Sequence, residues 1–279
     1  MSLIDVWNIA TFDDELAAHL RGAADLIRDY LTTSHRQYLE REASDHTQPY
    51  PINPYGADYV AFTDGLVPLM EARSIRAWHY TRITDAEAVT LLRDGVHLSD
   101  LAAVRRRLDA QVAAGAFSGD VADALFDDSP FQSEQLESRS NKFWMVSHPR
   151  DIEDSGVELL LESWGGEAVY FWQRDPDLQS QLKRIGRPRV IELAIPLAAT
   201  NHAYSAGRTV VSAYALALGC PAESGAFDLY TRQALGPEAV LQIHTEGDAA
   251  FSGMARAYPA GFGDAVQELP ASCSADRNL

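Results

Sequence analysis

The feature that most restricts the fold of this chain is a short apolar strand that runs directly into a helix. The strand is predicted over residues 75–81. A helix is predicted over residues 85–94, because an amphipathic run there is followed by Gly95, and glycine often ends helices. We expect the inward positions of this helix to be Ala86, Val89 and Leu92. Three polar side chains follow one another on the strand: His79, Tyr80 and Thr81.

A second informative segment lies near the end of the chain. Gly236-Pro237 forms a rigid turn, Glu238 follows it, and residues 239–244 are predicted to form the last strand. This arrangement holds one carboxylate at the start of a strand. Glu238 can serve in catalysis there, or it can be an ordinary solvent-facing residue at a strand edge.

The segments between these two motifs alternate between helical and strand-like patterns, which is typical of an α+β fold. Strands are predicted over residues 142–147, 168–172 and 189–195. Helices are predicted over residues 101–111, 120–126 and 157–164. The pattern over residues 210–218 fits either a strand or a helix, and both remain open.

The N-terminal part reads as one long helix. Thr11 is a suitable cap, acidic residues fill the first turn, and the apolar stripe continues to about Glu42. Three prolines over residues 48–56 then interrupt regular structure. We therefore predict three parts: an N-terminal helical lobe with its Pro-rich connection at 1–56, a main α+β domain at 57–258, and a frayed tail at 259–279.

Composition restricts the environment of the protein. The chain has 279 residues, and 46% of them are hydrophobic, which is enough for one large core or for a core and a smaller lobe. No stretch reaches the roughly 18 apolar residues that span a bilayer, and the N-terminus lacks the basic and apolar regions of a secretory signal. We expect a soluble, cytoplasmic protein that does not enter a membrane.

Cysteine and histidine usage argues against a metal centre. The chain has two cysteines and eight histidines, without the paired spacings that hold zinc. Neither a disulfide framework nor a metal site is expected.

The His-Tyr-Thr strand, the helix that ends in Asp-Gly and the late Glu before an apolar strand together resemble the ADP-ribosyltransferase superfamily. Members of this family cleave NAD at its nicotinamide–ribose bond. The resemblance implies a split, mixed β-sheet core with flanking helices over roughly residues 70–250. It also implies NAD as the substrate, and either an ADP-ribosyltransferase or an NAD glycohydrolase activity.

The resemblance assigns roles to particular residues. Glu238 takes the position of the catalytic Glu, which opposes the positive charge that develops on the ribose as nicotinamide leaves. His79 would bond a ribose hydroxyl, and Thr81 would contact the nicotinamide amide or the adjacent ribose. Each of these residues can instead be an ordinary core or strand-edge residue.

The nicotinamide-binding residues are less sharply defined. Ser147 matches only part of the serine-rich motif that some family branches carry on their second strand. Tyr80, Trp144 and Tyr170 are the candidate stacking partners, although buried aromatic residues usually serve the core. Glu167 follows Gly165-Gly166 and is a candidate second acid, while the plainer interpretation of this segment is a helix end before a strand.

Charge and one missing residue bear on the acceptor. The net charge of −17 opposes an extended contact with nucleic acid, so a protein or small molecule is the expected acceptor. A nucleic-acid acceptor would instead require a basic cluster beside His79, formed by Arg105, Arg106, Arg107, Arg139 and Lys142. Gly236 stands where arginine- and asparagine-specific branches of the family carry Glu or Gln, which makes those acceptors doubtful.

A function from another class also fits the sequence. The strong negative charge and the aromatic residues between Pro49 and Tyr59 suit an acidic, non-enzymatic binding module. Such a module could be the antitoxin or immunity partner of a basic protein. The two hypotheses differ in one simple geometric respect, because the enzyme requires His79 and Glu238 to face one cleft.

Overall fold

The computed structural model describes residues 2–43, 49, 51–133, 135–222 and 225–256. The chain forms two compact units. The first, here called the helical unit, contains Met1–Ile75 and Pro196–Phe227, and the second, the sheet unit, contains Arg76–Ile195 and Asp228–Arg256. The first unit therefore does not end near residue 56, where the prolines suggested a boundary. The predicted tail at 259–279 lies outside the described residues.

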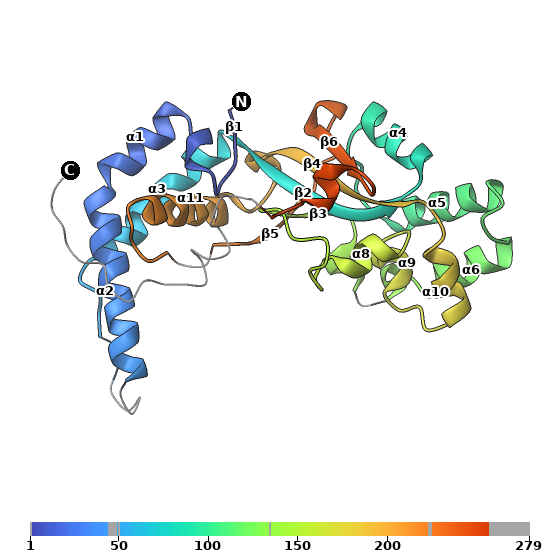
Figure 1. Ribbon diagram of the computed structural model, residues 1–279, viewed down its shortest axis with the longest axis horizontal. Coiled ribbons are helices and arrows are strands. Elements are labelled where there is room, and N and C mark those ends of the chain that lie inside the picture. Colours follow the sequence, from blue (N-terminus) through green and yellow to red (C-terminus); the bar gives the residue numbers. More distant parts are fainter. Residues whose placement is uncertain (1, 44–48, 50, 134, 223–224, 257–279) are drawn as a thin grey trace. The chain divides into compact units, whose positions relative to one another are not determined.

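The helical unit consists mainly of four helices (Figure 1). They are α1 (Asp14–Gly22), α2 (Ala24–Glu42), α3 (Gly56–Glu71) and α11 (Ala203–Ala217). Short 3₁₀ turns lie at Ile9–Thr11 (η1) and Leu197–Ala199 (η3), and β1 (Leu3–Ile4) pairs in parallel with Ser74 and Ile75. None of the helices in the described part of the chain is long and apolar enough to cross a membrane.

The single long helix predicted at the N-terminus is two helices. The chain leaves helical geometry at Ala23, whose φ and ψ are −107° and 10°. The cap is Asp13 rather than Thr11, because the Asp13 carboxylate accepts a hydrogen bond from the Leu16 amide at 3.0 Å. Thr11 instead ends η1 and donates its hydroxyl to the Asn8 carbonyl.

The segment at 210–218 belongs to a helix, α11, which packs against α3. Apolar and small residues fill nearly every position of α11, and most of them are buried. Gly207 lies at this contact, where a Cβ would be at van der Waals distance, 3.5 Å, from the Leu66 side chain. The ambiguity in the pattern arose because a helix that is buried on most sides loses its polar stripe.

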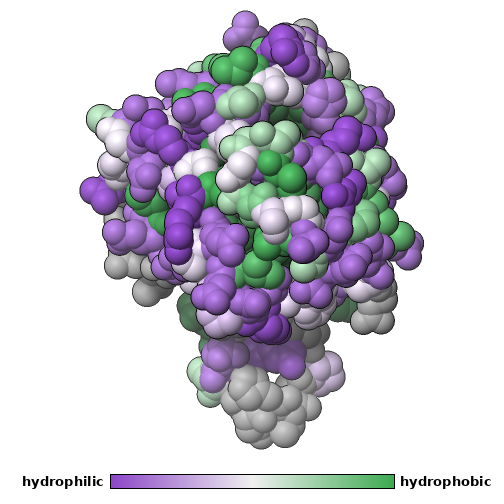
Figure 2. All heavy atoms as spheres, turned by 90° about the vertical axis from the view of Figure 1, so that its right-hand side faces the viewer, coloured by the Kyte–Doolittle hydropathy of each residue, from purple (hydrophilic) through white to green (hydrophobic). Residues whose placement is uncertain are grey.

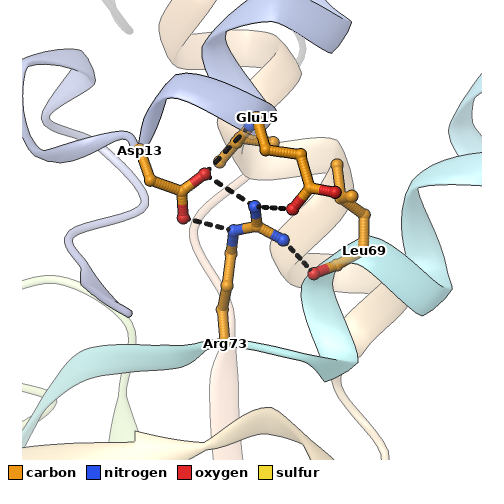
Figure 3. Close-up of polar contacts among 5 residues, drawn as sticks. Asp13, Glu15, Leu69 and Arg73 are labelled. Atoms are coloured by element: carbon orange, nitrogen blue, oxygen red, sulfur yellow. Dashed lines mark hydrogen bonds and ion pairs between the residues drawn. The ribbon is translucent and has the colours of Figure 1, made fainter. Parts of the chain in front are cut away.

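One arginine joins two helices of the helical unit (Figure 3). The Arg73 side chain is 3% exposed, and its guanidinium makes two hydrogen bonds with the Asp13 carboxylate at 2.6 and 2.8 Å. It also bonds Glu15 at 2.9 Å and the Leu69 carbonyl. Arg73 thereby ties the start of α1 to the end of α3 and lowers the pKa of Asp13 to about 2.

The sheet unit is built on β2 (Ser74–Ile83), β3 (Phe143–Val146), β4 (Arg187–Pro196), β5 (Asp228–Thr231) and β6 (Val240–Thr245). The order across the sheet is β5-β3-β2-β4-β6. β2 is antiparallel to β3, and β3 is antiparallel to β5. Helices flank this sheet, so the predicted α+β class is confirmed. The strands predicted at 75–81, 142–147, 189–195 and 239–244 are also confirmed, whereas β5 was not predicted.

The helices of the sheet unit are α4 (Asp85–Asp94), α5 (Leu101–Ala113), α6 (Gly119–Asp127), α7 (Leu136–Arg139), α8 (Glu158–Glu162), α9 (Glu167–Tyr170), α10 (Pro176–Leu182) and α12 (Ala249–Ser252). Short 3₁₀ turns lie at Pro130–Gln132 (η2) and Pro237–Ala239 (η4). In Figure 1, α4 lies above the strands, and α5, α6 and α8–α10 lie below and beside them. Of these helices, α5, α6, α9 and α10 share an apolar core around Trp164, which is fully buried.

The predicted bounds of α4 are confirmed, but its predicted inward face is wrong. Thr84 and Glu87 form a reciprocal capping box at its start, and Gly95 ends it with a φ of 83°. Val89 and Leu92 are 60% and 53% exposed, and Ala88 is buried instead. Figure 2 views the protein from the right-hand side of Figure 1, so that the sheet unit faces the viewer. On this face, hydrophilic side chains surround a central patch of apolar ones.

The strand predicted over residues 168–172 is also wrong. Gly165 and Gly166 have φ values of 91° and 63°, and they redirect the chain into the single turn of α9. A Cβ on Gly165 would collide with the Val169 side chain, so this turn requires glycine. Val169 is buried, but Phe171 and Trp172 are more than a third exposed, which a buried central strand would not allow.

Candidate functional site

A cavity of about 510 Å³ lies within the sheet unit. Its walls come from β2, β3, the start of β5, α5, the end of α7, and the segments before α8 and α9. Five of the predicted NAD-contact residues line it: His79, Tyr80, Thr81, Trp144 and Glu167. Its volume is within the range of small-molecule sites.

His79 contributes a neutral imidazole to the wall. Its Nδ1 lies 2.8 Å from the Trp144 carbonyl oxygen. Because a carbonyl only accepts, Nδ1 carries the proton, and Nε2 is left as an acceptor. The ring also packs against Phe143, with ring centroids 4.3 Å apart. Burial lowers the pKa of His79 to about 4, so the ring is uncharged near neutral pH.

Tyr80 holds a neighbouring part of the wall in place. Its hydroxyl donates to the Arg150 carbonyl at 2.7 Å and accepts from the Arg150 amide at 2.6 Å. Burial raises the pKa of this phenol, so it stays protonated and keeps both bonds. Thr81, the next residue on β2, is buried. Tyr80 therefore fixes the backbone from which the Arg150 side chain enters the cavity wall.

The lining carries more positive than negative side chains, although the whole chain has a net charge of −17. The cations are Arg107, Arg139, Lys142 and Arg150. The carboxylates are Glu167 and Asp228. Clustered cations in a concave, partly apolar site raise the local concentration of anions.

Arg107, on α5, is held in place by Glu87 of α4. Its Nε donates to Glu87 at 2.7 Å, and its guanidinium lies 5.0 Å from the centre of the Trp164 ring. Glu87 also accepts from the Trp164 indole at 2.8 Å and from the Thr84 amide at 2.9 Å. Burial acts to raise the pKa of Glu87, but the charge of Arg107 and these hydrogen bonds outweigh it, so the pKa is lowered.

The other cations are held in different ways. Arg139 forms an ion pair with Glu167 and lies 4.5 Å from the centre of the Phe171 ring. Arg150 pairs with Asp154 at 3.3 Å. The Lys142 ammonium instead donates to two carbonyls at the end of α7, at 3.0 and 2.9 Å. Arg107, Arg139 and Lys142 thus meet at the cavity, whereas Arg105 pairs with Asp109 and Asp123 away from it.

The two carboxylates of the lining differ in their partners. Glu167 is neutralised by Arg139. Asp228 is exposed at the start of β5, and its carboxylate makes no ion pair or hydrogen bond with any residue that the structure describes. Strand pairing places Asp228 opposite Val146 and Val146 opposite Trp78. Since neighbouring strands lie about 4.8 Å apart, the Asp228 backbone is about 10 Å from β2.

Glu238 takes its predicted place directly before the last strand, but it does not line the cavity that His79 lines. It lies in η4 before β6, at the opposite edge of the sheet from β5, and it is not among the residues that line the cavity. Its side chain is exposed and folds back over Gly236, whose Cβ, if present, would overlap the carboxylate. His79 and Glu238 therefore do not share this cavity, and the expectation that both face one cleft is not met there.

Two further candidates lie outside the lining. Ser147 follows β3 and is fully buried. Tyr170 is half-buried and packs against the apolar core beside α9, where burial raises its pKa. Neither residue is therefore available to a ligand in the cavity as described.

Asp228 and Arg150 were not singled out from the sequence. β5 has only four residues, Asp-Leu-Tyr-Thr, and so short a run gives a weak strand signal. Arg150 follows His148-Pro149, in a segment without periodicity. In the structure, the buried residues Leu229 and Thr231 alternate with the less buried Tyr230, as is typical of a strand.

No group of three or more histidine, cysteine or acidic side chains in the described ranges is arranged to hold a metal ion. Comparisons with protein-family models, with curated proteins and with solved structures found no match to this chain.

Proposed function

We propose that the sheet unit binds NAD in this cavity and cleaves the bond between nicotinamide and ribose. The ADP-ribose would pass to an acceptor or to water. The observation that carries the proposal is the convergence, in one cavity, of the His79-Tyr80-Thr81 strand, four cations and Asp228, a carboxylate without a cationic partner among the described residues. Because Glu238 does not line this cavity, the enzyme proposed here is not the one expected from the sequence, in which His79 and Glu238 face one cleft.

The cavity lining has the chemistry that a dinucleotide requires. Arg107, Arg139 and Arg150 each keep guanidinium N–H groups beyond those bonded to their carboxylate partners, and such groups bind the two charges of a pyrophosphate. The free acceptor of His79, Nε2, can take a hydrogen bond from a ribose hydroxyl. The Trp144 and Phe143 rings offer flat apolar surfaces to a base.

The reaction needs a negative charge near the sugar. The bond from C1′ to the pyridine nitrogen breaks, nicotinamide leaves with the bonding electrons, and positive charge develops on the ribose. A nucleophile then bonds to C1′ and loses its proton. Asp228 is the better candidate to oppose this positive charge, because Arg139 already neutralises Glu167.

A matched pair of substitutions tests this assignment. In Asp228→Asn, loss of a preorganised charge is expected to raise the barrier by about 3 kcal/mol, which lowers nicotinamide release roughly a hundredfold. In Glu238→Gln, release should stay at the wild-type rate. The measurement is chromatographic detection of nicotinamide after incubation of the pure protein with NAD, and circular dichroism confirms that both variants are folded.

If Glu238→Gln lowers nicotinamide release and Asp228→Asn does not, the catalytic role belongs to Glu238. If the folded wild-type protein releases no nicotinamide and calorimetry detects no NAD binding, the enzyme proposal fails. The alternative would then be the acidic binding module, for which the net charge of −17 is the support.

A further inference from the structure

Beside the cavity, an exposed aromatic ring, Trp144, and a half-buried one, Tyr230, carry cations on their faces. Trp144 on β3 and Tyr230 on β5 are cross-strand neighbours, with ring centroids 4.6 Å apart. The Lys142 ammonium lies 5.8 Å from the centre of the Trp144 ring and 4.9 Å from that of Tyr230. The Arg232 guanidinium lies 5.3 Å from the centre of the Tyr230 ring. We call these four residues the aromatic–cation cluster.

The charges of this cluster are not neutralised by acids. Lys142 donates to the carbonyls of Glu137 and Ser138, and Arg232 donates to the Tyr230 hydroxyl at 3.2 Å. Neither cation has a carboxylate partner among the described residues. Arg107, Arg139 and Arg150 in the nearby cavity each have one.

The cluster extends from the cavity onto the surface next to it. Trp144 and Lys142 line the cavity, whereas Tyr230 and Arg232 do not. Trp144 is 42% exposed, so its ring is accessible from solvent. A ligand that occupies the whole cluster therefore extends beyond the cavity, which is where an acceptor must lie to reach a sugar held inside.

We propose that the aromatic–cation cluster binds single-stranded nucleic acid, and that this strand supplies the acceptor of the reaction proposed above. Bases stack on exposed aromatic rings on a β-sheet, and Lys and Arg beside those rings bind the phosphates. Only unpaired bases offer a free face, so a duplex fits poorly. The proposal rests on the proposed function for its chemistry, but the binding itself requires no NAD.

The local arrangement reverses what the net charge suggests. A charge of −17 predicts weak binding to nucleic acid, as long as the basic residues are spread over the surface. Lys142 and Arg232, which have no acidic partner in the described part of the chain, provide a small site at the Trp144–Tyr230 pair. Because only about two phosphates are neutralised, the slope of log affinity against log salt should be shallow, about −1.4 for a single strand.

The test measures binding of fluorescein-labelled 12-nucleotide single strands of DNA and of RNA to the full-length protein by anisotropy, without NAD. Tyr230→Leu should weaken binding about five- to a hundredfold, because a stacking ring is lost. Tyr230→Phe keeps the ring and should bind like wild type. Arg232→Gln should weaken binding several-fold and reduce the salt slope by about 0.7.

Matched controls lie on the helical unit. Tyr38→Leu and Arg21→Gln remove an exposed tyrosine and an exposed arginine of α2 and α1, and they should leave binding unchanged. Any of three outcomes would overturn the proposal. The strand could bind Tyr230→Leu as tightly as wild type, or the duplex of the same sequence could bind wild type as tightly as the single strand. An acidic, tryptophan-containing peptide could also compete as well as the unlabelled strand.

Nicotinamide release separates this inference from the proposed function. Tyr230→Leu and Arg232→Gln lie outside the cavity lining, so release from NAD alone should equal that of wild type. Strand binding without any nicotinamide release would refute the NAD activity and leave the surface assignment standing. Nicotinamide release without strand binding would refute the surface assignment alone.

Discussion

The helical unit and the sheet unit both join arginines to carboxylates, but in different settings. Arg73 in the helical unit is 3% exposed, and two carboxylates and a carbonyl surround its guanidinium. Arg107 in the sheet unit is 35% exposed, has one carboxylate partner, Glu87, and borders a cavity. The number of partners around each guanidinium thus separates an arginine that holds the fold from one that can also bind a ligand.

The comparison teaches how to interpret ion pairs in this protein. Burial removes water from a charge, so a buried arginine must satisfy its donors within the protein. At the edge of a cavity, the remaining donors can be satisfied by water or by an anionic ligand instead. We therefore expect the first kind of pair to govern stability and the second to govern binding.

The largest expected effect is on the stability of the helical unit. Arg73→Ala leaves Asp13 and Glu15 without their common partner, and should lower the free energy of unfolding by about 3 kcal/mol. Urea denaturation followed by circular dichroism measures this. Arg28→Ala, which removes an exposed pair with Asp25, should cost less than about 1 kcal/mol. Equal effects of the two substitutions would contradict the comparison.

A smaller effect is expected on ligand affinity in the sheet unit. Glu87→Gln retains a residue suited to the capping box but removes the charge that orients Arg107, so NAD affinity should fall by about 1 kcal/mol, or roughly fivefold. Calorimetry with NAD measures it. Glu162→Gln, which loses an exposed pair with Lys183, is the control and should bind NAD like wild type.

A further effect concerns the stability of the helical unit in acid. Asp13 has a pKa of about 2 in the folded protein and an ordinary value of 3.8, so the unfolded chain binds more protons between these values. The stability that this carboxylate contributes is complete above about pH 3.8 and is lost as the pH falls toward 2. Urea midpoints between pH 5 and 2.5 should fall more steeply for wild type than for Asp13→Asn. Parallel slopes would show that Arg73 does not hold this carboxylate.

Local signals in the sequence predicted several elements well. Gly95 indicated the end of α4, and the predicted bounds of this helix are confirmed; the structure adds the capping box of Thr84 and Glu87 at its start. The inward face of α4 depends on where the sheet lies, and Val89 and Leu92 are exposed despite their apolar side chains. The glycine stop of α4 could thus be predicted from the sequence, whereas its packing could not, and the cap of α1 was predicted at Thr11 instead of Asp13.

The candidate site divides in the same way. His79, Tyr80, Thr81 and Trp144 lie on strands that alternation indicates, and they meet in the cavity. Asp228 comes from a four-residue strand whose place beside β3 results from pairing across more than 80 residues of sequence. Glu238 has the stronger local pattern, yet the order of strands puts it at the far edge of the sheet. Strand order depends on the whole chain, so a motif alone does not determine it.

The crossing of the chain between the two units has a consequence for synthesis on the ribosome. The helical unit is incomplete until α11 has been made, because α3 ends at Glu71 and its partner begins at Ala203. Yet the groups that bond the Arg73 side chain all come from the first 73 residues. We expect the ion pairs of Arg73 with Asp13 and Glu15 to hold α1 against α3 early in translation. This contact would limit the exposure of the apolar face of α3 until α11 emerges.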